Sequence, residues 1–215
     1  TEEWVIKNQK YIFVIVILVT LLVLGSLGFN KYIQEPKESQ ATNDMFQSQQ
    51  YFDQAVNGAS KDSLFTLALN GADGKYGFLD IADLYSGSKA GNLANYYAGM
   101  AYLNMKDYSN AVTYLNAFSS NDDVLGPIAK GGIGDAFVQL EQLDDAYDYY
   151  VQAAQLKSNN YTTPMYLYKA GVIGLKLGNY SSALGFFNQI KSDFSESTEA
   201  KDIDIFIGKA EAAIN

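Results

Sequence analysis

Residues 93–118, LANYYAGMAYLNMKDYSNAVTYLNAF, set a pattern that residues 128–153 and 165–190 repeat. In each segment a glycine is followed twelve residues later by an alanine and sixteen residues later by a large apolar side chain. The glycines are Gly99, Gly134 and Gly171, and the alanines are Ala111, Ala146 and Ala183. Small residues let two antiparallel helices approach closely, and large ones fill the space between successive pairs. The pattern therefore predicts three helix-turn-helix units, with turns at residues 104–107, 139–142 and 176–179.

The spacing of these units resembles the tetratricopeptide repeat, a helix-turn-helix with a period of 34 residues. The three glycines are separated by 35 and 37 residues, and the segments DYSNAVTYL, QLDDAYDYY and NYSSALGFF match the pattern of that family. Two turns carry Lys106 and Glu141 where the family often has glycine, and Gly174 stands where an aromatic residue is usual. The resemblance implies an all-α helical solenoid with three repeats over residues 93–195.

Further helices are predicted on both sides of the three units. Residues 39–57 show the spacing of an amphipathic helix, and Ser60 is predicted to cap a short helix through residue 68. The residues of the amphipathic helix expected to face a core are Met45, Phe46, Phe52 and Val56. We expect residues 36–92 to form a linker, this amphipathic helix and a degenerate first repeat. Residues 196–215 are expected to form a C-terminal capping helix, because terminal repeats need a polar outer face.

Residues 11–29, YIFVIVILVTLLVLGSLGF, contain no charged side chain. As an α-helix they would be about 28 Å long, close to the ~30 Å thickness of the bilayer hydrocarbon. A cleaved signal peptide is the closest alternative, because Ser26 and Gly28 resemble the small residues before a cleavage site, but its apolar region usually has only about 7–15 residues. We therefore expect residues 1–35 to form a tail and a single transmembrane helix. Pro36 is predicted to end this helix, because proline disfavours helix at the preceding residue.

Composition excludes several classes of function. The chain has no histidine, cysteine or arginine, and 15 lysines against 24 acidic residues give a net charge of −9. Zinc sites, cysteine nucleophiles, Ser-His-Asp triads and disulfides all need residues that are absent. An acidic chain is also poorly suited to binding nucleic-acid phosphates. Because acid pairs such as Asp122 and Asp123 usually cap helices or stay in solvent, we expect a protein without enzymatic activity or a cofactor.

Protein binding is the function that remains, and the tetratricopeptide resemblance implies a groove formed by the first helix of each unit. The groove positions are Tyr96, Met100, Leu103 and Asn104 in the first unit, Gly131, Asp135, Val138 and Gln139 in the second, and Tyr168, Val172, Leu175 and Lys176 in the third. Their mostly apolar character favours an extended or helical segment with apolar anchors as the partner. The alternative is that Met100, Val172 and Leu175 simply pack against neighbouring helices. The tyrosines considered free to reach a partner are Tyr96, Tyr97, Tyr147, Tyr149, Tyr166 and Tyr168.

The order of parts over the whole chain resembles the YfgM-like ancillary subunits of the bacterial SecYEG translocon. Two segments, FLDIADLYSGSKAGNLANYYAGMAYL and YTTPMYLYKAGVIGLKLGNYSSAL, add to this resemblance. It implies a cytoplasmic tail, an inner-membrane anchor and a periplasmic array that works with a PpiD-like membrane-anchored chaperone on secreted polypeptides. The charges do not fix the orientation, because Lys7 and Lys10 precede the span while Lys31 and Lys37 follow it. A periplasmic adaptor for envelope assembly or cell division is the alternative.

Overall fold

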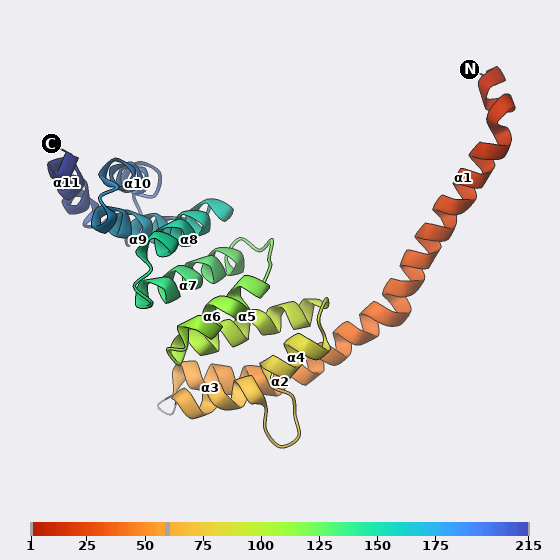
Figure 1. Ribbon diagram of the computed structural model, residues 1–215, viewed down its shortest axis with the longest axis horizontal. Coiled ribbons are helices and arrows are strands. Elements are labelled where there is room, and N and C mark those ends of the chain that lie inside the picture. The colour runs from red at the N-terminus through yellow and green to blue at the C-terminus, as the bar shows by residue number, and fades with distance from the viewer. Residues whose placement is uncertain (1, 59–60, 215) are drawn as a thin grey trace.

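The computed structural model describes residues 2–58 and 61–214, and every regular element in these ranges is a helix (Figure 1). Residues 1, 59–60 and 215, and with them the predicted cap Ser60, lie outside the described residues. The N-terminal elements are α1 (Glu2–Phe29), the π-helical turn η1 (Asn30–Gln34), α2 (Glu35–Asn57), α3 (Lys61–Asn70) and α4 (Phe78–Leu84). The remaining helices are α5 (Lys89–Asn104), α6 (Tyr108–Ala117), α7 (Leu125–Gln139), α8 (Leu143–Leu156), α9 (Thr162–Leu177), α10 (Tyr180–Asp193) and α11 (Ile203–Ile214). The predicted all-α class is confirmed.

The N-terminal helix is long and apolar, and none of its most apolar stretch is buried. Within the described residues it is the one helix long and apolar enough to cross a membrane, with a mean hydropathy of 2.9 in its most apolar stretch. The predicted end of this helix at Pro36 is wrong, because η1 joins α1 to α2 without a break. A proline ring clashes with the carbonyl four residues earlier in a regular α-helix. The wider π-helical turn directly before Pro36, in which the Glu35 N–H donates to the Asn30 carbonyl, accommodates it.

The start of α2 is bonded directly to the start of α5 and to the loop before α5. The predicted linker after Pro36 is therefore absent. The Glu38 carboxylate accepts hydrogen bonds from the backbone N–H groups of Lys89 at 2.7 Å and Ala90 at 2.8 Å. These groups are the unpaired donors at the start of α5, where the helix dipole also favours a negative charge. The Lys37 ammonium donates to the Ser86 carbonyl at 2.9 Å. The apolar helix α1 therefore continues through η1 into α2, and α2 is held in place by its hydrogen bonds to the start of α5 and to the loop before it.

The array consists of helical pairs stacked in chain order (Figure 1). The pairs α5–α6, α7–α8 and α9–α10 correspond to the three predicted units, and the ends of the predicted turns lie within two residues of the observed helix boundaries. The repeated glycines bring the paired helices together, because a Cβ atom on Gly99, Gly134 or Gly171 would lie 2.6, 2.7 or 2.4 Å from the large side chain sixteen residues later. These large residues are Leu115, Tyr150 and Phe187. The predicted close approach of the paired helices is confirmed.

Burial confirms part of the predicted core. Ala111, Ala146 and Ala183, the repeated alanines, are completely buried. The C-terminal helix α11 also packs against the array, with Ile203 and Ala210 buried. In α2, however, Phe46 and Val56 were expected to face the core and are 60% and 48% exposed. The side of α2 that packs on α3 and α5 carries the other two predicted core residues, the buried Met45 and the half-buried Phe52, whose ring centroid lies 5.4 Å from that of Phe65. The remaining buried residues of α2 are Ala41, Ser48 and Ala55.

The three turns within the pairs close in the same way. The residue seven positions after each repeated glycine has a left-handed backbone, with φ of 64° at Lys106, 60° at Glu141 and 81° at Gly178. The next residue donates its N–H to a carbonyl five residues earlier, at 2.9, 2.9 and 2.8 Å. The three hydrogen bonds are Asp107 to Tyr102, Gln142 to Phe137 and Asn179 to Gly174. This geometry is the Schellman motif, which usually places glycine at the left-handed position.

Because Lys106 and Glu141 occupy that position without being glycine, replacing each by glycine should stabilise the protein by about 0.5–1 kcal/mol. The gain is the relief of left-handed strain, reduced by the greater freedom of glycine in the unfolded chain. Urea unfolding of Lys106→Gly and Glu141→Gly measures it. Gly178→Ala is the reciprocal control and should lose about 1 kcal/mol. A loss of stability in either glycine variant would contradict the role of the left-handed turn.

Candidate partner-binding surface

The first helices of the three units form one layer, because α5 contacts α7 and α7 contacts α9. This layer carries all the positions predicted to line a groove. Each first helix also contacts the second helix of its own unit, and α7 and α9 contact the second helix of the preceding unit. Side chains of the first helices therefore divide between contacts inside the array and the surface of the layer.

In α5, three of the four predicted groove residues are half-buried by neighbouring elements. The ring of Tyr96 lies 5.2 Å from that of Phe118, and burial raises the pKa of the Tyr96 hydroxyl. Met100 and Leu103 lie over Gly132 of α7, with side-chain atoms 3.7 and 3.6 Å from the position of a Cβ atom there. These contacts agree with the alternative in which Met100 packs against the neighbouring helix.

In α7, Asp135 is the centre of a polar network that joins three helices. Its carboxylate accepts a hydrogen bond from the Tyr150 hydroxyl of α8 at 2.6 Å. It also accepts two from the Lys169 ammonium of α9, at 2.6 and 2.9 Å. The same ammonium lies 5.4 and 5.7 Å from the ring centroids of Tyr150 and Tyr166. Gly131 is required for this packing, because a Cβ atom there would lie 1.9 Å from the Tyr166 ring.

The network has clear electrostatic consequences. Burial and the nearby Asp135 charge raise the pKa of Tyr150, and the same two causes raise the pKa of Tyr166. Both hydroxyls therefore stay protonated to a higher pH than an ordinary tyrosine, and the Tyr150 hydroxyl donates its hydrogen bond to Asp135 over that wider range. Tyr166 was considered free to reach a partner and is buried instead, with 3% of its surface exposed. Lys169 is not among the predicted site residues, because its role depends on Asp135, which lies one unit earlier in the array.

Because the Asp135–Lys169 pair is about one-third exposed, we expect Lys169→Met to destabilise the protein by only about 1 kcal/mol. In a protein that already carries Asp135→Asn, Lys169→Met should reduce the free energy of unfolding by clearly less. Urea unfolding of the wild type, the two single variants and the double variant gives the interaction energy between the two residues. Lys191→Met is the matched control, because Lys191 and Asp204 form a far more exposed ion pair. Equal losses for the two methionine variants would show that the Asp135 network contributes nothing specific.

In α9, the C-terminal helix covers part of the predicted groove. The Tyr168 ring packs edge-on against Phe206 of α11, with 5.0 Å between the ring centroids. Val172 and Leu175 are half-buried against the C-terminal part of the core, and Val138 of α7 packs against the same cluster. The apolar groove positions of the third unit are therefore largely occupied by the chain itself.

Three of the predicted groove residues remain exposed, one in each unit. Asn104, Gln139 and Lys176 lie at or next to the last residue of α5, α7 and α9. The Asn104 amide donates to the Met100 carbonyl at 2.8 Å, and the Gln139 side chain accepts from the Tyr108 hydroxyl at 3.3 Å. The part of the layer that remains free for a partner is therefore the row of helix ends beside the turns within the pairs.

Acidic residues cap helices or remain in solvent, as predicted. Asp122 accepts hydrogen bonds from the N–H groups of Val124 and Leu125, which lowers the pKa of its carboxyl group. Asp80 accepts one from the Gly77 N–H at 3.1 Å. Among the described residues, no three or more acidic side chains are grouped to hold a metal ion.

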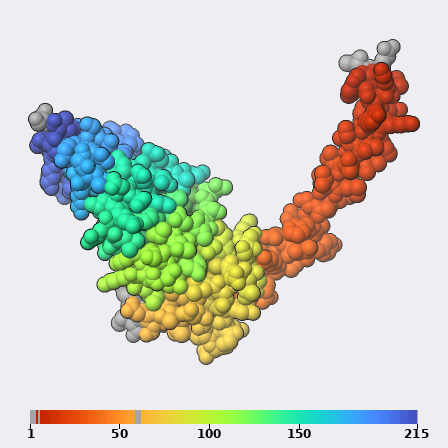
Figure 2. Space-filling view, in the orientation of Figure 1, coloured from red at the N-terminus to blue at the C-terminus, as the bar shows by residue number. Residues whose placement is uncertain are grey.

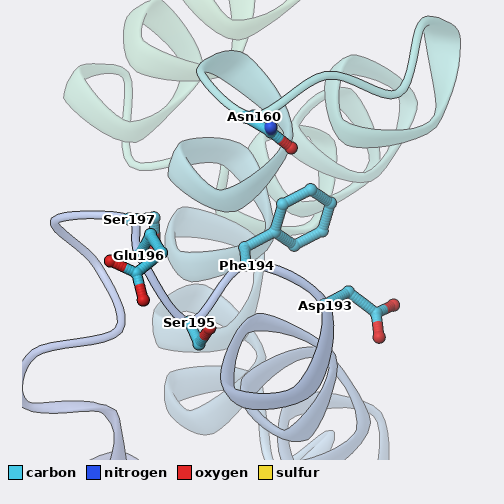
Figure 3. Close-up of a pocket in the computed structure, with 6 residues that line it drawn as sticks. All are labelled: Asn160, Asp193, Phe194, Ser195, Glu196 and Ser197. Carbon is cyan, nitrogen blue, oxygen red and sulfur yellow. The ribbon is translucent and has the colours of Figure 1, made fainter.

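A hollow of about 190 Å³ lies beside the last pair, where the ring of Phe194 points toward Asn160 (Figure 3). Its other lining residues are Asp193, Ser195, Glu196 and Ser197. Its lining holds two carboxylates and two hydroxyl groups, and among the described residues neither serine hydroxyl donates a hydrogen bond to a carboxylate.

Comparison with known proteins identifies no relative by sequence. No protein-family model matches the chain, and no curated protein matches it.

Proposed function

We propose that this protein is a non-enzymatic, membrane-anchored scaffold whose tetratricopeptide repeats bind other proteins beside the Sec translocon. The observation that carries the proposal is the apolar helix α1, which runs through η1 into a stacked array of helical pairs. The 35- and 37-residue spacing, the shared turn closure and the shared glycine contacts support assignment of the pairs as tetratricopeptide repeats.

The attachment of α2 to α5 supports a scaffold held at the membrane surface. Lys37 and Glu38, eight and nine residues after the end of α1, form hydrogen bonds with residues 86–90, so α5 starts near the end of the apolar helix. A protein-binding surface in this place suits polypeptides emerging from a channel in the same membrane. The resemblance to YfgM-like subunits adds the orientation, with a cytoplasmic tail, a periplasmic array and a PpiD-like chaperone as partner.

Co-purification of the full chain from native nanodiscs tests the proposal. We expect the translocon and a PpiD-like chaperone to be enriched over the level seen with an unrelated single-span protein. The triple variant Asn104→Glu, Gln139→Glu, Lys176→Glu should lose the chaperone, because it adds charge to the exposed helix ends. The control Thr113→Glu, Gln152→Glu, Asn188→Glu places the same side chain at exposed positions of the second helices and should retain it.

Absence of both the channel and the chaperone would contradict the proposal. Enrichment of envelope-assembly or division proteins in their place would support the periplasmic adaptor instead.

A further inference from the structure

The loops that join successive helical pairs lie along one edge of the array, and hydrogen bonds connect this edge to the start of α2, just after α1. Lys37 binds the loop between α4 and α5 through the Ser86 carbonyl. Asn92, in the first turn of α5, then exchanges two hydrogen bonds with the backbone of Ser119, at 2.7 and 3.0 Å. Ser119 belongs to the loop between α6 and α7. This loop therefore lies along the same edge as the exit of α1.

The next loop continues this edge. The Asn159 side chain, in the loop between α8 and α9, donates to the Asp123 carbonyl at 2.8 Å. Lys157 lies 3.8 Å from the Asp123 carboxylate. We call the loops 85–88, 118–124 and 157–161 together the membrane-side edge. The turns within the pairs, at residues 105–107, 140–142 and 178–179, lie at the other ends of the same helices.

The membrane-side edge faces α1. Figure 1 shows α1 and the array diverging from their junction, with the loops between α6 and α7 and between α8 and α9 on the side of the array nearer to α1. The same arrangement is seen in Figure 2, where short projections of the green and teal part of the array extend toward the red helix. If α1 crosses a bilayer, this edge faces the surface of that bilayer.

Exposed apolar side chains gather on two loops of this edge and the adjoining helix end. Val124 is 38% exposed, Leu156 43% and Tyr161 67%. The Asn159–Asp123 hydrogen bond holds the two loops together, so the three side chains belong to one local surface. A tyrosine flanked by aliphatic residues is typical of groups that settle at the membrane–water interface.

The acidic residues of these loops are already compensated. Asp123 pairs with Lys157. Asp122 accepts two backbone N–H groups at the start of α7, where the helix dipole offsets its charge. Asp193 and Glu196 line the hollow next to Asn160, but the surface formed by the two loops themselves carries little uncompensated charge, whereas residues 39–215 hold the whole net charge of −9. Such a surface approaches phospholipid headgroups with less repulsion than the rest of the array.

We propose that Val124, Leu156 and Tyr161 contact the headgroup region of the bilayer that α1 crosses, as a second membrane contact. This inference rests on the membrane anchoring in the proposed function. The array then lies along the membrane surface, and the exposed helix ends at Asn104, Gln139 and Lys176 point away from the bilayer. The contact places the partner-binding helix ends on the water side.

The absence of cysteine from the chain allows a direct test, because one introduced cysteine can be labelled uniquely. In each of the full-length variants Tyr161→Cys, Leu140→Cys and Leu22→Cys, the introduced cysteine is labelled with an environment-sensitive fluorophore. Each labelled protein is then placed in nanodiscs made of a mixture of phosphatidylethanolamine and phosphatidylglycerol. Leu140 is the matched control, since it is an exposed apolar residue at the opposite edge. Lipids with a quencher near the headgroup should quench the Tyr161 label several-fold more than the Leu140 label. Lipids with a quencher deep in the chains should quench the Leu22 label.

Each outcome separates the two proposals. Equal, weak quenching at positions 161 and 140 together with strong quenching at position 22 would overturn the second contact and leave the anchor intact. Weak quenching at position 22 would overturn the anchor itself, and the second contact with it. Because the nanodiscs contain neither translocon nor chaperone, and the quencher is on the lipid, quenching at position 161 reports contact with lipid rather than with a protein partner.

Discussion

Replacing Gly171 by leucine is expected to destabilise the array by about 3 kcal/mol, measured as the loss of unfolding free energy in urea. A Cβ atom at this position would lie 2.4 Å from the Phe187 ring, inside the pair α9–α10. Helix propensity acts in the opposite direction, because leucine is favoured over glycine by about 0.8 kcal/mol in a helix interior. The sign of the effect therefore reports on the contact between the two helices.

Gly185 provides the matched control, because it lies in the next helix of the same pair with no atom within 4 Å of its Cβ position. Gly185→Leu should stabilise the protein by up to about 0.8 kcal/mol. Phe187→Ala alone should cost about 3–5 kcal/mol. Adding Gly171→Leu to Phe187→Ala should recover part of that loss, because the new side chain enters the vacated space. Strictly additive losses would contradict the proposed packing.

Introducing aspartate at both Leu18 and Leu22 is expected to release the protein from membranes. Both side chains are more than half exposed on α1, one helical turn apart. A charged residue near the centre of a transmembrane helix costs about 3 kcal/mol on insertion scales, so two cost about 6 kcal/mol. Alkaline carbonate extraction should move the double variant from the membrane pellet to the supernatant.

The double variant Leu18→Ala, Leu22→Ala is the control for this change. It removes the same two side chains without adding charge, and it should remain in the pellet. Retention of the aspartate variant in the pellet would show that contacts other than α1 hold the protein at the membrane.

The sequence predicted the helical pairs well because one spacing recurs three times. Glycine, alanine and a large apolar residue are tied to positions where two helices must touch, so their recurrence reports the packing itself. The turns were located for the same reason. Lys106 and Glu141 show that a turn geometry can persist without its usual glycine, because the surrounding hydrogen bonds determine the backbone.

Features that are not tied to the repeated spacing could not be predicted in the same way. Pro36 favours a helix end locally, but the π-helical turn before it allows α1 to continue into α2. Phe46 was assigned to a core together with Met45 and Phe52, yet only Met45 and Phe52 lie on the face of α2 toward α3 and α5, and Phe46 is exposed. The pairing of Asp135 with Lys169 joins two units, and their 34-residue separation in sequence gave no sign of it.

The candidate surface was predicted in part. The repeat pattern identified which helices form its layer, and the structure brings α5, α7 and α9 together. It did not identify which side chains the neighbouring elements cover. Tyr168 is packed by α11 and Met100 lies over α7, whereas Asn104, Gln139 and Lys176 stay exposed.

The most direct test of protein binding by this layer is photocrosslinking in intact cells, with a photoreactive residue at Asn104, Gln139 or Lys176 and adducts identified by mass spectrometry. Probes at Thr113, Gln152 and Asn188, on the second helices, serve as the reference. We expect the first set to yield a common protein adduct that the second set lacks. Identical adduct patterns from both sets, or none from either, would contradict a partner-binding role for the first helices.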